Sequence, residues 1–470
     1  MKKIKSAVAI LLLPMCFLWG GCQNTSEPAM PQDFIGESPK GERLLEKESP
    51  YTICFREESG KGTVYIFGSP VSFWNEEDQL TLIDNHLVSV SDKELKKSGY
   101  RYQNKQCDIG VYFPKDLTEM PILIQNGEQN LKVSPVQDKK AFRSVKKESF
   151  QDKLDRSHDA VTYSDDENTK IQFIPTSSGV TASVTFFKKP ASNALEFSVA
   201  FPQDAVPQVV GSQYIAIKGQ KNSSVQSILY PSYLEDETGK TSFQNQLSIQ
   251  QEGDRYRYTI KLDQSFLDHS DIQYPVTITP SFELYRNKMA DSTVYSGLPD
   301  QNAYLSNFTV MGTHPVYGES MEYLRFRLQY IVGTYSQNVE SASLCLPNLT
   351  KNSPSLSLEL YRLKDIWSST GLTWRKKDKT YDLLSSTTMN QAGRNMLDIT
   401  AFVKDSYDDD LWETETQGLA LKATDGSQEY QIYPTYDNAL YQPYVKVVFK
   451  DMPPVFEHVT TINPDGGVQD

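Results

Sequence analysis

The chain has 470 residues and a formal net charge of −13 at pH 7. This acidic balance argues against nucleic acid as a partner, because binding to phosphates needs a basic face. The 27 tyrosines and 21 phenylalanines favour β-strands, and the length is ample for two or three domains. Composition therefore predicts a β-rich extracellular protein that does not bind nucleic acid.

Residues 1–22 have the pattern of a bacterial secretion signal. A lysine-rich start is followed by the apolar run Ala7–Trp19, which is too short to span a bilayer. Gly20-Gly21-Cys22 ends the run and is similar to a lipobox, although Trp19 stands where that pattern has Leu. We expect a lipoprotein-type signal with lipidation at Cys22, which would attach the protein to a membrane. Ordinary secretion with cleavage near the glycines is the alternative.

The region after the signal predicts a tether and two β modules. Residues 23–50 are polar, lack an apolar period and predict a disordered tether. Strand-like stretches in residues 51–136 predict a first β module, and residues 161–280 a second, with residues 137–160 as a charged linker. The second module has the clearer pattern, because apolar and polar residues alternate strictly around Val180, Ala182, Val184 and Phe186, around Leu195, Phe197 and Val199, and around Tyr256, Tyr258 and Ile260.

Two tryptophans follow a predicted strand in the C-terminal part. Apolar and polar residues alternate over Ser355–Leu360, and Trp367 and Trp374 then flank a Ser-Ser-Thr-Gly turn. One interpretation is that the rings pin a loop over the end of a β-sandwich; the other is that a ring stacks on a sugar. The basic run Arg375–Lys379 is either a rim for an acidic polysaccharide, through Arg375 and Lys377, or a solvated strand-edge hairpin.

Tyr361–Trp374 resembles the Trp-Ser-x-x-x-x-Thr-Trp signature of the DNRLRE domain, grouped with carbohydrate-binding modules of family 96. Further pieces resemble this family in the expected order: Asp291–Tyr295, Pro299–Tyr304, Tyr323–Leu328, Ser343–Leu346, Leu397–Val403, Gly418–Lys422 and Tyr444–Phe449. The resemblance implies that residues 289–450 form an antiparallel, jelly-roll-like β-sandwich, and we expect this module to fold alone. Successive side chains of a strand point to opposite faces, so we expect Leu324, Phe326 and Leu328 to point inward and Arg325 and Arg327 to lie on the opposite face.

The region before this module resembles the N-terminal part of wall-associated RHS/YD-repeat proteins of Gram-positive bacteria. Pro70–Asn85, Val111–Lys115 and Tyr274–Pro280 match phrases of that family, with Thr279 in place of its usual Asp. We expect no repeat array, because the sequence ends in a short polar tail at residues 451–470.

Few residues suggest catalysis or metal binding. The five histidines are scattered and none lies in a catalytic motif, and no CxxC pair indicates zinc. We therefore expect no catalytic residue, metal or cofactor. Cys54 and Cys107 could form a disulfide, while Cys345 lies in a predicted strand. Asp405–Asp410 could bind calcium or form the solvated end of a helix.

The sequence thus predicts an all-β protein with two N-terminal β modules followed by a C-terminal antiparallel β-sandwich. The predicted function is that of a non-catalytic carbohydrate-binding lipoprotein on the outer face of the cytoplasmic membrane of a Gram-positive bacterium. The alternative is a structural or interaction protein of the cell envelope. Trp367, Trp374, Arg375 and Lys377 are the candidate ligand-binding residues, and the expected partner is a polysaccharide, acidic or neutral, or a cell-wall component.

Overall fold

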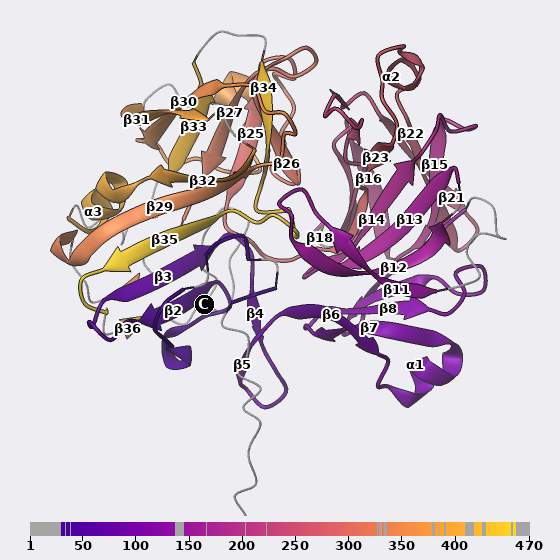
Figure 1. Cartoon of the computed structure of the whole chain (residues 1–470), viewed down its shortest axis with the longest axis horizontal. Coiled ribbons are helices and arrows are strands. Elements are labelled where there is room, and N and C mark those ends of the chain that lie inside the picture. The colour runs from indigo at the N-terminus through magenta and orange to yellow at the C-terminus, as the bar shows by residue number, and fades with distance from the viewer. Residues whose placement is uncertain are drawn as a thin grey trace, which may run out of the picture.

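A computed structural model describes residues 30–32, 34–37, 39–136, 145–165, 167–202, 204–221, 223–326, 328, 331–332, 336–377, 381–389, 392–408, 418–424, 429–452 and 455–456. Cys22 and the rest of the predicted signal, residues 137–144 of the predicted linker and residues 457–470 of the predicted tail lie outside these. Most of the described chain is β-strand, arranged as two neighbouring sandwiches (Figure 1). The predicted all-β fold class is confirmed.

The first sandwich consists of an eight-stranded and an eleven-stranded sheet. The eight-stranded sheet has the order β21 (Gln246–Glu252), β22 (Arg255–Lys261), β15 (Ala194–Ala200), β10 (Gln129–Pro135), β9 (Ile122–Asn126), β8 (Gly110–Pro114), β7 (Tyr100–Gln106) and β6 (Asp84–Ser89). The other has the order β11 (Lys146–Gln151), β12 (Ser157–Asp165), β13 (Thr169–Pro175), β14 (Gly179–Phe186), β24 (Ser281–Leu284), β18 (Val225–Tyr230), β17 (Tyr214–Gly219) and β16 (Ala205–Val210), with β23 (Val276–Ile278), β19 (Leu234–Glu235) and β20 (Thr241–Ser242) branching from β14.

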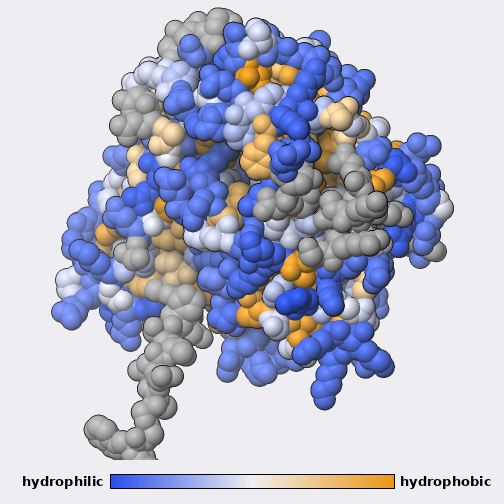
Figure 2. Space-filling view, turned by 45° about the vertical axis from the view of Figure 1, so that its right-hand side comes forward, coloured by the Kyte–Doolittle hydropathy of each residue, from blue (hydrophilic) through white to orange (hydrophobic). Residues whose placement is uncertain are grey.

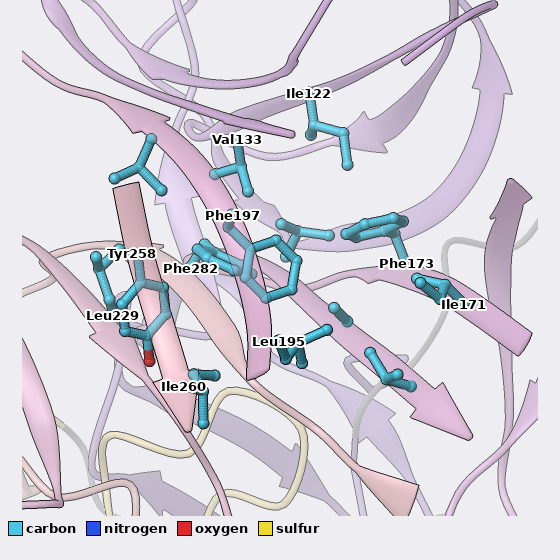
Figure 3. Close-up of a cluster of buried hydrophobic side chains, with 14 of the residues drawn as sticks. Ile122, Val133, Ile171, Phe173, Leu195, Phe197, Leu229, Tyr258, Ile260 and Phe282 are labelled. Atoms are coloured by element: carbon cyan, nitrogen blue, oxygen red, sulfur yellow. The ribbon is translucent and has the colours of Figure 1, made fainter. Parts of the chain in front are cut away.

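Side chains from both sheets fill the core of the first sandwich. Figure 3 shows Phe197 between Phe173, Tyr258 and Phe282, and the ring centroids of Phe197 and Phe282 are 4.7 Å apart at a steep angle. Such edge-to-face packing suits the charge distribution of aromatic rings. In β14 the alternating residues Val180, Ala182 and Val184 are fully buried, which confirms the inward face that the sequence predicts.

The second sandwich pairs a six-stranded with a seven-stranded sheet. The six-stranded sheet has the order β1 (Glu42–Arg43), β2 (Thr52–Arg56), β3 (Gly62–Phe67), β35 (Tyr444–Phe449), β29 (Val339–Asn348) and β32 (Gly393–Asp398). The other has the order β31 (Tyr381–Met389), β30 (Leu356–Leu363), β33 (Leu419–Ala423), β27 (Gly318–Leu324), β26 (Phe308–His314) and β34 (Tyr430–Pro434), with β25 (Asp291–Tyr295) on β27. Leu324, Phe326 and Leu328 are buried in its core as predicted; Arg327 lies outside the described residues.

Strand pairing crosses the module boundaries that the sequence predicts. β3 pairs antiparallel with β35 along its whole length, so the start of the predicted first module completes the C-terminal sandwich. In Figure 1 the indigo strand β3 lies beside the yellow β35, with β2 on its other side. The later strands of the predicted first module, residues 51–136, belong instead to the sandwich formed by the predicted second module, because β10 pairs with β15. Alternation sets which face of a strand is buried but does not name its partner strand.

The predicted tether and linker also belong to the fold where the structure describes them. Ile35 and Leu44 are buried, and the ring of Phe34 lies 5.0 Å from that of Tyr444 between centroids, so this part of residues 23–50 is packed against the six-stranded sheet. The linker contributes β11 and the start of β12. The side chains of β11 are mostly exposed because it is an edge strand, and edge strands commonly carry charge. The prediction of a linker was therefore wrong for residues 146–160, whose charged side chains belong to the edge of a sheet.

The two sandwiches meet through aromatic side chains. Tyr233 of the first packs on Phe308 of the second with centroids 5.5 Å apart, and Phe243 packs on Tyr317 at 5.6 Å. These residues belong to one buried cluster that draws on both sandwiches. Contacts of this kind fix the relative position of the two bodies.

The remaining elements are short. They are the helices α1 (Lys93–Ser98), α2 (Gln264–Asp268) and α3 (Thr400–Asp408), the 3-10 turns η1 (Leu45–Lys47), η3 (Ser336–Asn338) and η4 (Trp374–Lys376), and the pairs β4 (Ser72–Trp74) with β5 (Leu80–Leu82) and β28 (Ile331–Val332) with β36 (Val455–Phe456). Of the helices described, none has the length and apolar character needed to cross a membrane. The face in Figure 2 is mostly hydrophilic, with scattered hydrophobic patches.

Candidate functional site

Trp367 lies in the loop after β30, and its side chain is packed inside the module. The residue is 5% exposed, and its ring lies 5.4 Å from the ring of Tyr323 between centroids. The guanidinium of Arg325, also buried, lies 4.9 Å from the Trp367 ring and donates a hydrogen bond of 2.6 Å to the Trp367 carbonyl. The ring and the carbonyl together stabilise this buried cation. The position fits the loop-pinning interpretation, and it leaves Trp367 no ring face for a sugar.

Asn302 connects this loop to the segment between β25 and β26. Its side-chain nitrogen donates to the carbonyls of Ser369 and Leu372, at 2.5 and 2.7 Å. The two amide hydrogens of one side chain thus bond two carbonyls of the loop. Two stretches that the sequence singled out, Pro299–Tyr304 and Tyr361–Trp374, are therefore brought together in the fold.

Trp374, Arg375 and Lys377 lie together at the end of this loop, in and just after η4. The Trp374 ring is half-buried, and Lys377 Nζ lies 4.3 Å from its centroid. Arg375 is 66% exposed, its Nε lies 2.9 Å from Asp300 Oδ1, and its backbone N–H donates to the carbonyl of Pro299. An exposed pair of this kind contributes little to stability. The geometry leaves a ring with two cations at the surface; Asp378 and Lys379 lie outside the described residues.

A buried group of charges at the start of β25 was not predicted from the sequence. Lys288 Nζ donates to Asp291 at 2.5 Å, to Asp437, and to the carbonyl of Tyr304 at 2.7 Å. Burial raises the pKa of Asp437, and the neighbouring Lys288 ammonium opposes this effect. Asp291 also accepts the backbone N–H of Tyr436. No local pattern signals this group, because Lys288 and Asp437 are distant in the chain.

The structure locates the three cysteines and the part of the acidic segment Asp405–Asp410 that it describes. Cys54, Cys107 and Cys345 carry free thiols, and Cys54 and Cys107 belong to different sandwiches, so the disulfide does not form. Asp405 lies in α3 and forms an ion pair with Arg362. Within the described ranges, no three His, Cys, Asp or Glu side chains are grouped as metal ligands.

Comparison with known proteins gave one family. Residues 283–447, about a third of the chain, match the model of carbohydrate-binding module family 96. The match supports the prediction of such a module in the C-terminal part, whereas the resemblance of the N-terminal part to RHS-type wall proteins finds no support. No curated protein matches the chain.

A solved structure of a Paenibacillus xanthan lyase aligns at 9% identity over 88% of this chain and 49% of that one, with a TM-score of 0.11. The chain thus spans about half the length of that lyase, and so low a score carries no argument about fold or activity. The family match thus shows that residues 283–447 of this chain are similar to carbohydrate-binding module family 96.

Proposed function

We propose that this protein is a non-catalytic carbohydrate-binding protein of the bacterial cell surface. The observation that carries the proposal is the match of residues 283–447 to a carbohydrate-binding module family. Glycan-array binding of the purified full chain tests it directly. If no glycan binds, the alternative of a structural or interaction protein of the cell envelope is favoured.

Within the module, we place sugar contact at Trp374, Arg375 and Lys377. A half-buried ring can stack on the apolar CH face of a sugar, while the cations donate charge-assisted hydrogen bonds to a carboxylate. The backbone N–H of Arg375 donates to the carbonyl of Pro299 and fixes the backbone on this side of the rim, which reduces the ordering that binding would require. The side chain of Arg375 would exchange its exposed partner Asp300 for the ligand carboxylate. The composition of the rim favours an acidic polysaccharide.

Replacing both rim cations is expected to weaken binding of a polyuronate without changing folding. The variant Arg375→Ala with Lys377→Ala removes one exposed and one partly exposed charge, both at the surface, so its melting temperature should stay close to that of the wild type. Affinity of the wild type should fall as salt rises, because the attraction is electrostatic, and the variant should lose most of this salt dependence. Calorimetric titration at low and high salt measures both effects.

The matched control is Lys96→Ala with Lys97→Ala in α1, which changes the net charge equally at another exposed position. This control should bind as the wild type does. If the rim variant also binds as the wild type does, the rim is not the site.

The variant Trp374→Ala tests whether the ring stacks on the sugar or packs in the core. Lower affinity at an unchanged melting temperature supports a stacking role. A large fall in melting temperature assigns the ring to the core.

We further propose that Cys22 carries lipid and begins the mature protein, on the outer face of the cytoplasmic membrane of a Gram-positive bacterium. Met30 already packs against the six-stranded sheet, so the chain from Cys22 to Met30 spans at most about 30 Å. Lipidation would therefore place the second sandwich close to the membrane surface. Mass spectrometry of the mature N-terminus should find an acylated Cys22, and an unmodified terminus elsewhere would contradict this proposal.

A further inference from the structure

A cleft of about 390 Å³ lies between the two sandwiches. Its floor is the outward face of β14, β23 and β24 in the first sandwich. Its other side comes from the second sandwich, including Asn307, Phe308 and the segment Asn438–Tyr441. Pockets of about 300–1,000 Å³ commonly hold small ligands, and they occur preferentially where domains meet.

The floor of the cleft is a surface of hydroxyl groups. Because side chains alternate along a strand, the neighbours of the buried core residues of β14 face the cleft. Thr181 and Thr185 of β14 stand directly opposite Ser281 and Thr277 of the adjoining strands. Ser183 and Thr279 also line the floor. Each hydroxyl can both donate and accept a hydrogen bond, as sugar hydroxyls can.

Aromatic rings and a buried amide form the sides of the cleft. Tyr233, Phe308 and Tyr441 line it and are fixed by burial in the seam between the sandwiches. Asn307 is 8% exposed, and its Oδ1 accepts no hydrogen bond from the described part of the chain. This oxygen is itself buried, so Asn307 contributes to the wall of the cleft and the three rings supply its accessible apolar surface.

The charges in the cleft disfavour an acidic ligand. Lys153 is already engaged, since its Nζ donates to Tyr233 Oη at 2.8 Å and to Glu235. Glu283 lies at one end of the floor and accepts a hydrogen bond of 2.7 Å from Ser178, and burial raises its pKa to about 7. A carboxylate on the ligand would meet the carboxyl groups of Asp152, Glu235 and Glu283. The two lysines that line the cleft are already paired, Lys153 with Glu235 and Lys351 with Glu237, so the site disfavours added negative charge.

We infer that this cleft is a second binding site, for a short segment of neutral glycan. It is built from hydroxyls, an amide and aromatic rings, whereas the rim at Trp374 is built from a ring and cations. Most of its floor precedes residue 283, outside the segment that matches the carbohydrate-binding family. The inference therefore does not rest on the proposed function of the rim.

Calorimetric titration of the full chain with cellotetraose, xylotetraose and chitotetraose tests the site, with tetragalacturonate as the acidic comparison. At least one neutral tetrasaccharide should bind, with little dependence on salt. Ser183→Phe fills the floor and should weaken that binding at least about tenfold. Ser198→Phe is the matched control, because Ser198 faces outward on β15 in the opposite sheet. It should bind as the wild type does, and so should Arg375→Ala with Lys377→Ala.

Several outcomes would overturn the inference. One is that no neutral tetrasaccharide binds; another is that Ser183→Phe binds as the wild type does. Binding of tetragalacturonate alone, lost in the rim variant, would support the rim and refute the cleft. If Ser183→Phe lowers the melting temperature, Thr181→Val with Thr279→Val decides instead, since this change keeps shape and removes two hydroxyls. It should weaken binding by about five- to tenfold, and unchanged affinity refutes the site.

Discussion

Residues 289–450 produced alone should fail to give a stable, soluble sandwich. In the full chain β35 is an interior strand of its sheet. Residues Gly62–Phe67 of β3 pair with residues Tyr444–Phe449 of β35 over the whole length of both strands. The shortened chain would leave β35 as an unpaired edge, which promotes aggregation. It would also lose the fully buried Val64 and Ile66, each worth about 1.5–3 kcal/mol. Together with the buried side chains of β2, which are also lost, this is a large part of a typical total stability of about 5–15 kcal/mol.

Circular dichroism and urea unfolding of residues 289–450 measure this effect. Joining residues 39–69 to the N-terminus of that piece through a flexible linker should restore a cooperative transition, because β1, β2 and β3 are then available to β35. The same fusion with Val64→Asp and Ile66→Asp is the control and should not restore it. If residues 289–450 alone unfold cooperatively at the urea concentration of the full chain, the N-terminal strands are dispensable, as the sequence had predicted.

Lys288→Met is expected to cost about 3–5 kcal/mol of folding free energy, because it leaves buried carboxyl groups without their cation. Lys288 contacts both Asp291 and Asp437, and all three side chains are almost inaccessible to solvent. Removing the lysine removes the interaction that lowers the pKa of both carboxyls against the effect of burial. Urea unfolding at neutral pH measures the loss.

The sign of the pH dependence follows from these shifts. In the variant, folding favours the protonated carboxyls, so the native state binds more protons than the unfolded chain and its stability rises as pH falls. The difference from the wild type should therefore be smaller near pH 5 than near pH 8. Adding Asp291→Asn and Asp437→Asn to Lys288→Met should recover part of the loss. A Lys288→Met variant as stable as the wild type at neutral pH would show that this group is not important for folding.

Several local features could be predicted from the sequence because they depend on neighbouring residues. Alternation in β14 identified Val180, Ala182 and Val184 as core residues, and the same reasoning identified Phe326. Side chains point to opposite faces in turn along any strand, whatever its partner. The proximity of Trp374, Arg375 and Lys377 was predictable for the same reason, since three residues so close in the chain cannot lie far apart.

Features that depend on distant residues were decided by the tertiary structure alone. The short apolar strand β3 could belong to either sandwich by its sequence, and only its pairing with β35 selects one. Trp367 and Trp374 look alike in the sequence. In the fold, Arg325 and Tyr323 pack against the ring of Trp367 and bury it, whereas the ring of Trp374 stays half-exposed. The cleft needs hydroxyls from one sandwich opposite Asn307 and Phe308 from the other. Residue patterns thus indicated which side chains of strands such as β14 form the core, while long-range packing determined the partners of each strand. The reason is that apolar burial is non-directional and favours any partner of suitable shape.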